Sequence, residues 1–465
     1  MLFHRKVTLR QYFSGSSPPT GSYIIIGLVV DDVLNTAILR NTWSGLMSRS
    51  FALGGKVVSK MDTRKFILGD AVDFAHRTLD HDLKSYLPFA WRGQTDPTIL
   101  LDAAILDGKF SFNTPTLPDH ICRMRVTVLK DATLPCFAFV HGLFDGESAF
   151  DMVRFFCDLL SEKSIPGFSL APDVSGTRMS DLVRMPATTE PSPCQPLPLP
   201  RDRKRDSIRS LDQLICHKTS EAVGLSQKFT ERLLHFPGAW VDELRRQAQQ
   251  ELDKTTTHAR VQLTRNDIIA AVYLKMLYSS RKASHQPVYF RGALGFRPFL
   301  QPPPPGVYYH HDSVFLQRCD FSTHQVQTES IAKLAERIRR TTLEFKKAAV
   351  IKQEIRFIED NDNATNFIFQ TSGSLKWNLL VVSPWTTFKY TGLDFSGASR
   401  TGRKPAVILV HPRVDRMTGV QVMISLKDGS GGYWIRATNT ADGWSAFETS
   451  ISRENLFGCD KTTST

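Results

Sequence analysis

The segment from Leu134 to Leu160 reads LPCFAFVHGLFDGESAFDMVRFFCDLL, and it decides the expected fold. Its first part, Cys136 to Val140, is a short apolar run, which predicts a buried strand. After the turn at Gly142, apolar residues recur at the spacing of a helix with one buried face. These residues are Ala149, Met152, Val153, Phe156, Leu159 and Leu160. The segment therefore predicts a strand, a glycine turn and an amphipathic helix.

His141 lies where this strand ends, and Asp145 lies where the helix begins. A histidine in that place has a backbone fixed by the sheet and a ring that can reach a cavity, which suits a general base. An aspartate at a helix N-terminus can cap the helix or hold a cation. The residues alone leave a second interpretation equally open, in which His141 is a hydrogen-bonded strand-end histidine and Asp145 only a cap.

The spacing His-x-x-x-Asp is a weak signal, because the chain contains it at His76–Asp80, His141–Asp145 and His411–Asp415. The first lies in a polar stretch typical of a solvated surface. The third ends an apolar run that we expect to pair with the strand-like segment Met417 to Leu426. Only the second combines a buried strand, a following glycine and an amphipathic helix, so context favours His141.

Length and composition indicate a globular protein of two or three domains. The chain has 465 residues, of which 41% are hydrophobic and 22% charged. Its longest apolar run, Tyr23 to Val30, is far shorter than the ~20 residues that span a bilayer, and no signal peptide is visible. The seven cysteines form no CxxC pair. We therefore expect no zinc site, no disulfide framework and a cytoplasmic location.

The formal net charge of +12 admits two kinds of partner. A nucleic acid is one, but the basic runs Arg201 to Arg209 and Arg337 to Arg340 are not interleaved with aromatic residues. A small polyanionic ligand such as a phosphorylated cofactor is the other. A solvated basic face explains any single run most simply.

Strand-like and helix-like segments alternate along the chain, which predicts an α/β or α+β sandwich. Met124 to Leu129 is expected to pair with the strand that leads to His141. The proline-rich stretch from Pro186 to Pro200 predicts a linker. We accordingly place an N-terminal domain at 1–185, a crossover linker at 186–225 and a C-terminal domain at 226–465. Further helices are predicted at 34–47, 236–252, 264–277 and 330–345.

HGLFDG at His141 to Gly146 resembles the HxxxDG motif of the BAHD acyltransferases, which use coenzyme A thioesters and share a superfamily with chloramphenicol acetyltransferase and peptide-synthetase condensation domains. Further stretches agree in the right order over most of the chain. They are Leu39 to Val58, Asn266 to Leu274, Arg297 to Pro303 followed by Tyr308, and Ser383-Pro384-Trp385 followed by Asp394-Phe395.

The resemblance implies two similar chloramphenicol-acetyltransferase-like domains with an active-site channel between them. In that scheme His141 is the general base, and Asp145 forms a salt bridge with Arg297, for which Arg291 is the local alternative. Ser383 and Trp385 face the oxyanion and the acceptor, although core packing remains an equal alternative for both. Structural support of the site comes from Gly146, Arg297, Asp394 and Phe395.

Three departures from the family pattern stand out. The DFGWG motif is replaced by Asp394-Phe395-Ser396-Gly397-Ala398, so only its first two positions are kept. His310-His311 stands where Gly-Asn is expected, and Phe299 replaces the second arginine of R-x-R. This divergence is more similar to the fungal specialised-metabolism branch than to the plant branch.

The expected function is transfer of an acyl group from acyl-CoA, as a co-substrate, to a hydroxyl or amine of a small metabolite. The scheme requires no permanently bound cofactor and no metal, and we expect a monomer without a membrane span. The first alternative is a protein of this fold that binds or cyclises a small molecule without acyl transfer. The second is a basic nucleic-acid-binding protein. The residues that bind coenzyme A are not predicted by these motifs.

Overall fold

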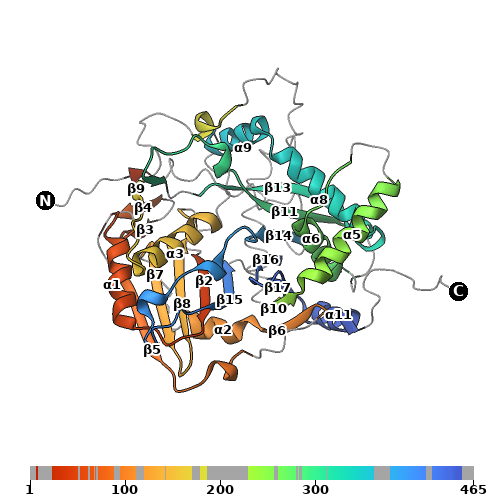
Figure 1. Cartoon of the computed structure of the whole chain (residues 1–465). Helices are drawn as coiled ribbons and strands as arrows, with labels where there is room; N and C mark the ends of the chain where they lie inside the picture. Colours follow the sequence, from red (N-terminus) through yellow and green to blue (C-terminus); the bar gives the residue numbers. More distant parts are fainter. Residues whose placement is uncertain are drawn as a thin grey trace.

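The structure is a computed structural model that describes most of the chain (Figure 1). The described residues are 7–8, 23–50, 53–60, 63–67, 69, 72–87, 95–111, 120–141, 143–169, 179–185, 229–255, 260–278, 281, 285–309, 312–360, 378–414 and 421–452. The predicted linker, Gly142 and His310-His311 lie outside them. Two large sheets organise the molecule, and the expected mixed α/β architecture is confirmed.

The first sheet has five strands in the order β15-β2-β8-β7-β5. The predicted pairing of the strand before His141 with its neighbour is confirmed, because β7 and β8 are antiparallel partners. The bounds are β2 (Tyr23–Val30), β5 (Asp73–Thr78), β7 (Cys122–Val128), β8 (Thr133–Val140) and β15 (Val407–Val414).

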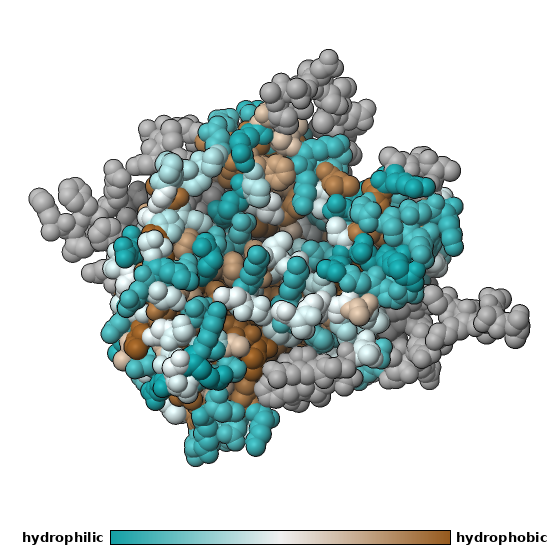
Figure 2. All heavy atoms as spheres, in the orientation of Figure 1, coloured by the Kyte–Doolittle hydropathy of each residue, from teal (hydrophilic) through white to brown (hydrophobic). Residues whose placement is uncertain are grey.

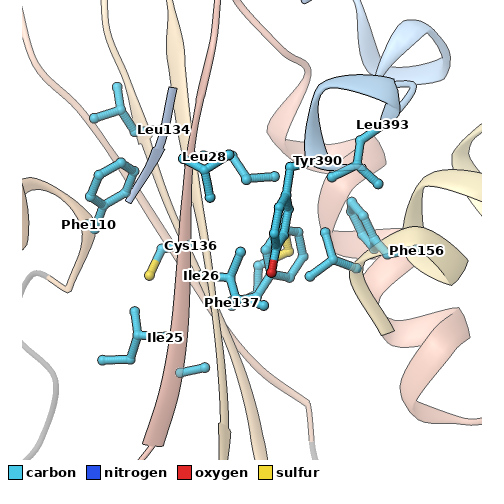
Figure 3. Close-up of a cluster of buried hydrophobic side chains, with 14 of the residues drawn as sticks. Ile25, Ile26, Leu28, Phe110, Leu134, Cys136, Phe137, Phe156, Tyr390 and Leu393 are labelled. Carbon is cyan, nitrogen blue, oxygen red and sulfur yellow. The ribbon is translucent and has the colours of Figure 1, made fainter. Parts of the chain in front are cut away.

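Strands β2 and β8 are buried along their whole length because both faces of this sheet are covered. Phe156 and the loop residues Tyr390 and Leu393 lie on one side, and Phe110 lies on the other (Figure 3). Phe110 packs directly on Gly27, where a Cβ would be 2.9 Å from the ring. Helices α1 (Thr36–Met47), α2 (Ala103–Phe110) and α3 (Gly146–Leu160) supply this cover.

The second sheet has seven strands in the order β13-β11-β14-β16-β17-β10-β6. Helices α5, α6 and α8 pack on one face of it (Figure 1), and α6 is buried on nearly every side. The bounds are β6 (Thr98–Asp102), β10 (Thr230–Phe236), β11 (Pro287–Gly295), β13 (Val314–Ser322), β14 (Leu379–Pro384), β16 (Gln421–Lys427), β17 (Tyr433–Asn439), α5 (Gly238–Thr255), α6 (Arg265–Tyr278) and α8 (Ile331–Phe345).

The smaller elements complete the fold. Strands β1 (Val7–Thr8), β3 (Lys56–Lys60) and β4 (Thr63–Ile67) form a small sheet, and β9 (Gly167–Ser169) pairs with β12 (Val307–Tyr309). Among the described residues, the remaining α-helices are α7 (Thr323–Thr328), α9 (Ala348–Asp360) and α11 (Ala441–Ser452). The predicted helices at 34–47, 236–252, 264–277 and 330–345 correspond to α1, α5, α6 and α8.

Each large sheet takes one strand from the other half of the chain. β6 precedes the predicted linker but joins the seven-stranded sheet, and β15 follows the linker but joins the five-stranded sheet. The expected pairing of the apolar run at His411 with Met417 to Leu426 is therefore wrong. β15 pairs with β2, whereas β16 lies between β14 and β17. The two halves are thus interlocked through their hydrogen-bonded backbones.

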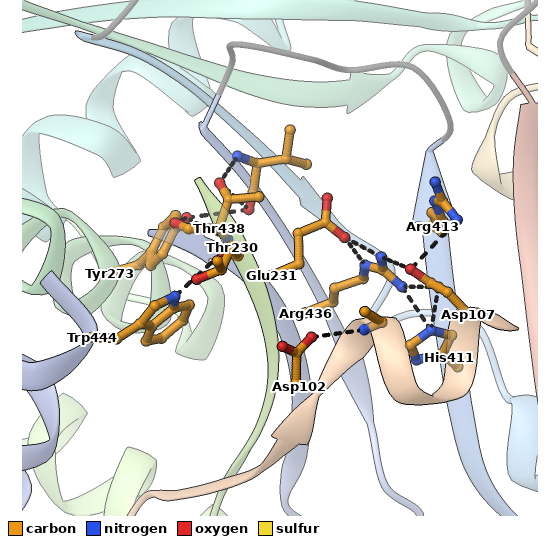
Figure 4. Close-up of polar contacts among 12 residues, drawn as sticks. Asp102, Asp107, Thr230, Glu231, Tyr273, His411, Arg413, Arg436, Thr438 and Trp444 are labelled. Carbon is orange, nitrogen blue, oxygen red and sulfur yellow. Dashed lines mark hydrogen bonds and ion pairs between the residues drawn. The ribbon is translucent and has the colours of Figure 1, made fainter. Parts of the chain in front are cut away.

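A cluster of charged side chains lies where the two sheets meet (Figure 4). The guanidinium of Arg436 donates to both carboxylate oxygens of Asp107 at 3.0 Å and, through Nε, to Glu231 at 2.8 Å. His411 Nε2 lies 2.8 Å from Asp107, and Arg413 lies 3.4 Å from it. Burial, with the nearby Arg436, lowers the pKa of His411 to about 4, so this histidine is neutral at pH 7. The negative charges of Asp107 and Glu231 then balance the positive charges of Arg436 and Arg413 where the two sheets meet.

The outer surface is mostly hydrophilic on the face drawn in Figure 2, with apolar side chains gathered below its centre, where Figure 1 draws α2 and β15. Within the described residues, no helix combines the length and the apolar character that crossing a membrane requires.

Candidate active site

His141 follows the last residue of β8, as the sequence predicts. Its side chain is 17% exposed, and its Nδ1 lies 3.7 Å from the Asp312 Oδ2 atom, slightly beyond hydrogen-bond distance. Burial lowers the pKa of His141 to about 4, although the negative charge of Asp145 acts in the opposite direction. The imidazole is therefore neutral at pH 7 and can accept a proton.

Asp145 caps α3 and joins the two halves of the chain. Its Oδ1 accepts hydrogen bonds from the Ser148 N–H at 2.7 Å and the Ser148 hydroxyl at 2.9 Å. Its Oδ2 accepts one from the Ser313 N–H at 2.8 Å and one from Arg297 at 3.1 Å. Burial raises the pKa of Asp145, but Arg297 and the two backbone N–H groups lower it by more. The carboxylate is 1% exposed and stays charged.

Arg297 begins a short 3-10 turn that one residue, Phe296, separates from the end of β11. Besides Asp145, it lies 3.7 Å from Glu147, and its guanidinium is 5.9 Å from the centre of the Tyr308 ring. The Tyr308 hydroxyl donates to Asp151 on α3 at 2.7 Å. The partner implied by the family pattern is thus brought to Asp145 together with the tyrosine that follows it.

The local alternative, Arg291, is held elsewhere. Its guanidinium lies 2.6 Å from Asp320, which is diagonally across the β11–β13 pair, and also donates to the Phe290 carbonyl at 2.9 Å. The structure therefore pairs Asp145 with Arg297 and not with Arg291.

Ser383 and Trp385 lie at the end of β14, on the opposite side of the site from His141's strand. The Trp385 indole N–H donates to the Ser383 hydroxyl oxygen at 2.9 Å. Since that oxygen is the acceptor in this contact, the hydroxyl proton remains free to point elsewhere. Trp385 is 4% exposed, and its ring lies against Gly146, the first residue of α3.

Asp394 and Phe395 lie away from this group, at the other end of α3. The fully buried Phe395 packs near Phe156, and Asp394 accepts the Ser396 N–H at 2.9 Å. Gly397 touches the end of α3 so closely that a Cβ would be 1.8 Å from the Leu160 carbonyl oxygen. A helix of 15 residues is about 22 Å long, so this loop supports the fold and does not enter the site.

A small cavity of about 60 Å³ lies between the two sheets at His141. Its polar lining comes from His141, Asp145, Ser383 and Trp385. Its apolar lining comes from strands of both sheets: Ile24, Ala293, Val314, Leu316, Val381, Val414, Val422 and Ile424. The imidazole therefore faces a cavity and not packed hydrocarbon.

Sequence reasoning missed Asp312, Ser313 and the apolar strand residues of this cavity. Asp312 and Ser313 directly follow His310-His311, where the family pattern is lost, and no motif identifies them. The apolar residues alternate along strands distant in sequence, so their common position depends on the sheet order. The replacement of the family's Gly-Asn by His310-His311, directly before Asp312, is the one sequence feature that marks this segment as unusual.

A second cavity, of about 700 Å³, lies at the turn between β16 and β17. Its size is that of a site for a cofactor-sized molecule. Gly238 and Ala239 at the N-terminus of α5 line it, as does His235, whose Nε2 lies 2.8 Å from Asp428. Among the described residues, no cluster of histidine, cysteine or acidic side chains could hold a metal ion.

We predict that Gly146→Ala lowers the free energy of unfolding by about 1–3 kcal/mol, a typical cost of overpacking. The added Cβ would lie 2.7 Å from Trp385 Nε1, so the indole must move. Urea unfolding followed by tryptophan fluorescence measures the change.

Gly45→Ala in α1 is the matched control, because a Cβ there meets nothing within 4 Å. Its stability should rise, by up to about 1 kcal/mol, since alanine is the better helix former. Equal effects of the two substitutions would show that Trp385 does not press on Gly146.

Comparison with known proteins shows which proteins this chain is similar to. No family model matches the chain. The acetyltransferase peniE of Penicillium patulum is 37% identical over 466 residues, which cover 94% of this chain and 96% of that protein. Among solved structures, TRI101 of F. sporotrichioides in complex with coenzyme A and T-2 has a TM-score of 0.65 at 14% identity, over 96% of this chain and 97% of that chain.

Vinorine synthase has a TM-score of 0.59 at 12% identity, over 95% of this chain and 91% of that chain. These structures share the fold, and the 37% identity to a named acetyltransferase over nearly the whole length establishes the family. The chain belongs to the BAHD-type acyltransferases, as its motifs indicate, and it is an acyltransferase.

Proposed function

We propose that this protein transfers an acyl group from an acyl-CoA to a hydroxyl or amine of a small molecule, with His141 as the general base. The observation that carries the proposal is the neutral, mostly buried imidazole of His141 at the cavity wall, in the same cavity as Ser383 and Trp385. The coenzyme A bound in the TRI101 structure supports the choice of donor.

The reaction needs a base, a stabilised oxyanion and two aligned substrates. The acceptor X–H would give its proton to His141 while its heteroatom bonds to the thioester carbonyl carbon. Collapse of the tetrahedral intermediate would break the carbon–sulfur bond, and the leaving thiolate would take the proton from His141. The products are the acylated acceptor and free coenzyme A, so atoms and charges balance.

Direct attack is favoured over an acyl-enzyme by the state of the cysteines. The four described cysteines are all buried: Cys122, Cys136, Cys157 and Cys319. Burial raises the pKa of each thiol, to about 12 for Cys136, so these groups stay protonated and are poor nucleophiles.

Ser383 is the candidate donor to the oxyanion. Its oxygen already accepts the indole N–H of Trp385, which leaves the hydroxyl proton available for a ligand oxygen in the cavity. A positioned donor of this kind contributes roughly 10²–10³ in rate in other acyl-transfer enzymes. Trp385 would act through Ser383, as a positioning residue.

Asp312 is a second positioning residue in this proposal. It is 1% exposed and faces Nδ1 of His141 at 3.7 Å, so it favours the tautomer that carries its proton on Nδ1. Nε2 then remains the basic nitrogen. Catalytic contacts are often longer in unliganded proteins than in the reacting complex.

We predict that His141→Ala lowers kcat by roughly 10²–10⁴, the usual contribution of a general base, while the fold is kept. Thiol release from acetyl-CoA in the presence of an acceptor measures the rate, and circular dichroism checks the fold.

His76→Ala is the matched control for this experiment, because His76 is also followed by an aspartate four residues later but is exposed on β5. The control should keep full activity. Undiminished turnover by a folded His141→Ala protein would refute the role of His141 as the general base.

Asp312→Asn should lower kcat by about 10–100-fold with little change in KM for acetyl-CoA, because the base loses orientation and not a binding contact.

The acidic limb of the kcat/KM profile of Asp312→Asn should also move. Activity needs neutral His141, so it falls as pH drops through the histidine pKa of about 4. Loss of the neighbouring negative charge favours the neutral ring further, which shifts this limb to lower pH.

Initial rates after a brief pH jump measure this shift. Asp267→Asn is the control, since Asp267 is 5% exposed but accepts a hydrogen bond from Thr264 at the start of α6, which packs on the seven-stranded sheet. The Asp267→Asn substitution can change stability, but it should not move the acidic limb of the kcat/KM profile. If Asp312→Asn changes neither kcat nor the pH of the acidic limb, then Asp312 does not position His141.

A further inference from the structure

A short segment at the end of the N-terminal half packs on the C-terminal half. We call residues 179–185 the strap. It begins with the 3-10 turn Met179–Leu182, which Figure 1 draws in yellow beside α9. Met179 and Val183 of the strap are buried in a hydrophobic cluster, and the other buried members of this cluster all lie between Leu294 and Ile355. The strap is therefore a further contact between the two halves of the chain.

The strap pairs with the backbone of the turn that begins at Arg297. The Gln301 N–H donates to the Leu182 carbonyl at 2.9 Å. In the opposite direction, the Arg184 N–H donates to the Phe299 carbonyl at 2.8 Å. Because the two bonds bind both strands of chain to each other, the position of the strap fixes the backbone of this turn.

The same turn reaches the site by two routes. Its Arg297 donates to Asp145 at 3.1 Å. The N–H of Phe296, the residue before it, donates to the Ser313 carbonyl at 2.8 Å, and the Ser313 N–H donates to Asp145 at 2.8 Å. Ser313 directly follows Asp312, the carboxylate that faces the imidazole. A shift of the turn would therefore move the groups around the candidate base.

Glu359, near the end of α9, holds the strap in place. Its carboxylate accepts hydrogen bonds from the Ser180 N–H at 3.2 Å and from the Ser180 hydroxyl at 2.6 Å. Ser180 is fully buried, so loss of the carboxylate would leave buried donors without a partner, which is costly. Another contact between α9 and the strap joins Arg356 to Asp181 at 3.4 Å, but both side chains are about half exposed and such pairs contribute little.

Phe299, which replaces the second arginine of the family's R-x-R segment, belongs to the same contact. Its side chain is partly buried against the cluster that contains Met179, as is Leu182 of the strap. A guanidinium in this apolar surrounding would need a counter-charge. The departure from the family pattern therefore provides an apolar surface on which the strap packs.

We propose that Glu359 is a positioning residue for acyl transfer. Through Ser180 and the strap, its carboxylate fixes the turn at Arg297. That turn supplies two of the donors to Asp145 and thereby sets the site in which His141 acts. The inference rests on the proposed role of His141, because the position of the turn affects the rate only if this histidine is the base.

Hydrogen exchange of the Ser313 backbone N–H tests the positioning, because this N–H donates to Asp145. Exchange is followed by mass spectrometry on peptides of the full chain that contain Ser313. Glu359→Ala should speed this exchange by at least about 5-fold, the effect of leaving a buried donor unpaired. Arg356→Ala is the matched control on the same helix, and it should leave the exchange unchanged because the ion pair that it removes is exposed.

The same variants give a kinetic test with acetyl-CoA as donor and benzyl alcohol as acceptor. Glu359→Ala should lower kcat by about 10-fold and leave KM for acetyl-CoA unchanged, because the site loses alignment and not a binding contact. Glu359→Gln should recover most of this loss, since its amide oxygen still accepts the Ser180 N–H. Arg356→Ala should keep the kcat of the parent chain.

Unchanged Ser313 exchange in a folded Glu359→Ala protein overturns the proposal, and so does equal acceleration in Arg356→Ala. Faster exchange with an unchanged kcat overturns it as well, because the strap would then hold the turn without affecting catalysis. If the parent chain does not turn over, the proposed acyl transfer fails, whereas the exchange rates still decide whether Glu359 holds the turn. Should Glu359→Ala not fold, Ser180→Ala takes its place, because it removes one of the two hydrogen bonds and keeps the backbone one.

Discussion

The carboxylate of Asp145 is the constraint on which the site depends. It receives hydrogen bonds from the first turn of α3, from the backbone of Ser313 and from Arg297. The first donor belongs to the N-terminal half and the other two to the C-terminal half. A buried charge with one partner removed costs about 3–5 kcal/mol, so this arrangement strongly favours the joined state of the two halves.

The position of His141 follows from that junction. Its backbone is fixed by β8 on one side and by the capped start of α3 on the other. Because Asp145 is occupied by Arg297, the carboxylate nearest to the imidazole Nδ1 is Asp312 from the other half. The cavity exists only where the two halves meet, which explains why its wall draws on strands of both sheets. Away from the cavity, the interface between the two halves is stabilised by the exchanged strands β6 and β15 and by the charged cluster at Arg436.

The sequence was sufficient where the information is local. The strand, turn and helix around His141 follow from periodicity, and the helices at 264–277 and 330–345 follow from caps and apolar spacing. Arg297 was identified because the family pattern specifies its distance from Pro302, which periodicity alone could not do.

The sequence was insufficient where pairing joins distant segments. The apolar run before His411 does not itself indicate which strand it pairs with. The nearest strand-like segment in the sequence is the simplest prediction, but the partner of β15 is β2. Asp312 could not be found because its role depends on a contact across 171 positions between two residues that share no motif. The aliphatic wall was missed for the same reason, since alternation predicts which side chains share a face but not what that face meets.

A double-mutant cycle between Asp145 and Arg297 tests this account most directly. The free energy of unfolding is measured by urea titration for the parent chain, Asp145→Asn, Arg297→Met and the double variant. The account predicts that each single change costs about 3–5 kcal/mol and that the double change costs at least about 2 kcal/mol less than their sum, because either loss leaves the other group buried and unpaired. Additive costs would contradict it, because the two halves would then be joined without this pair.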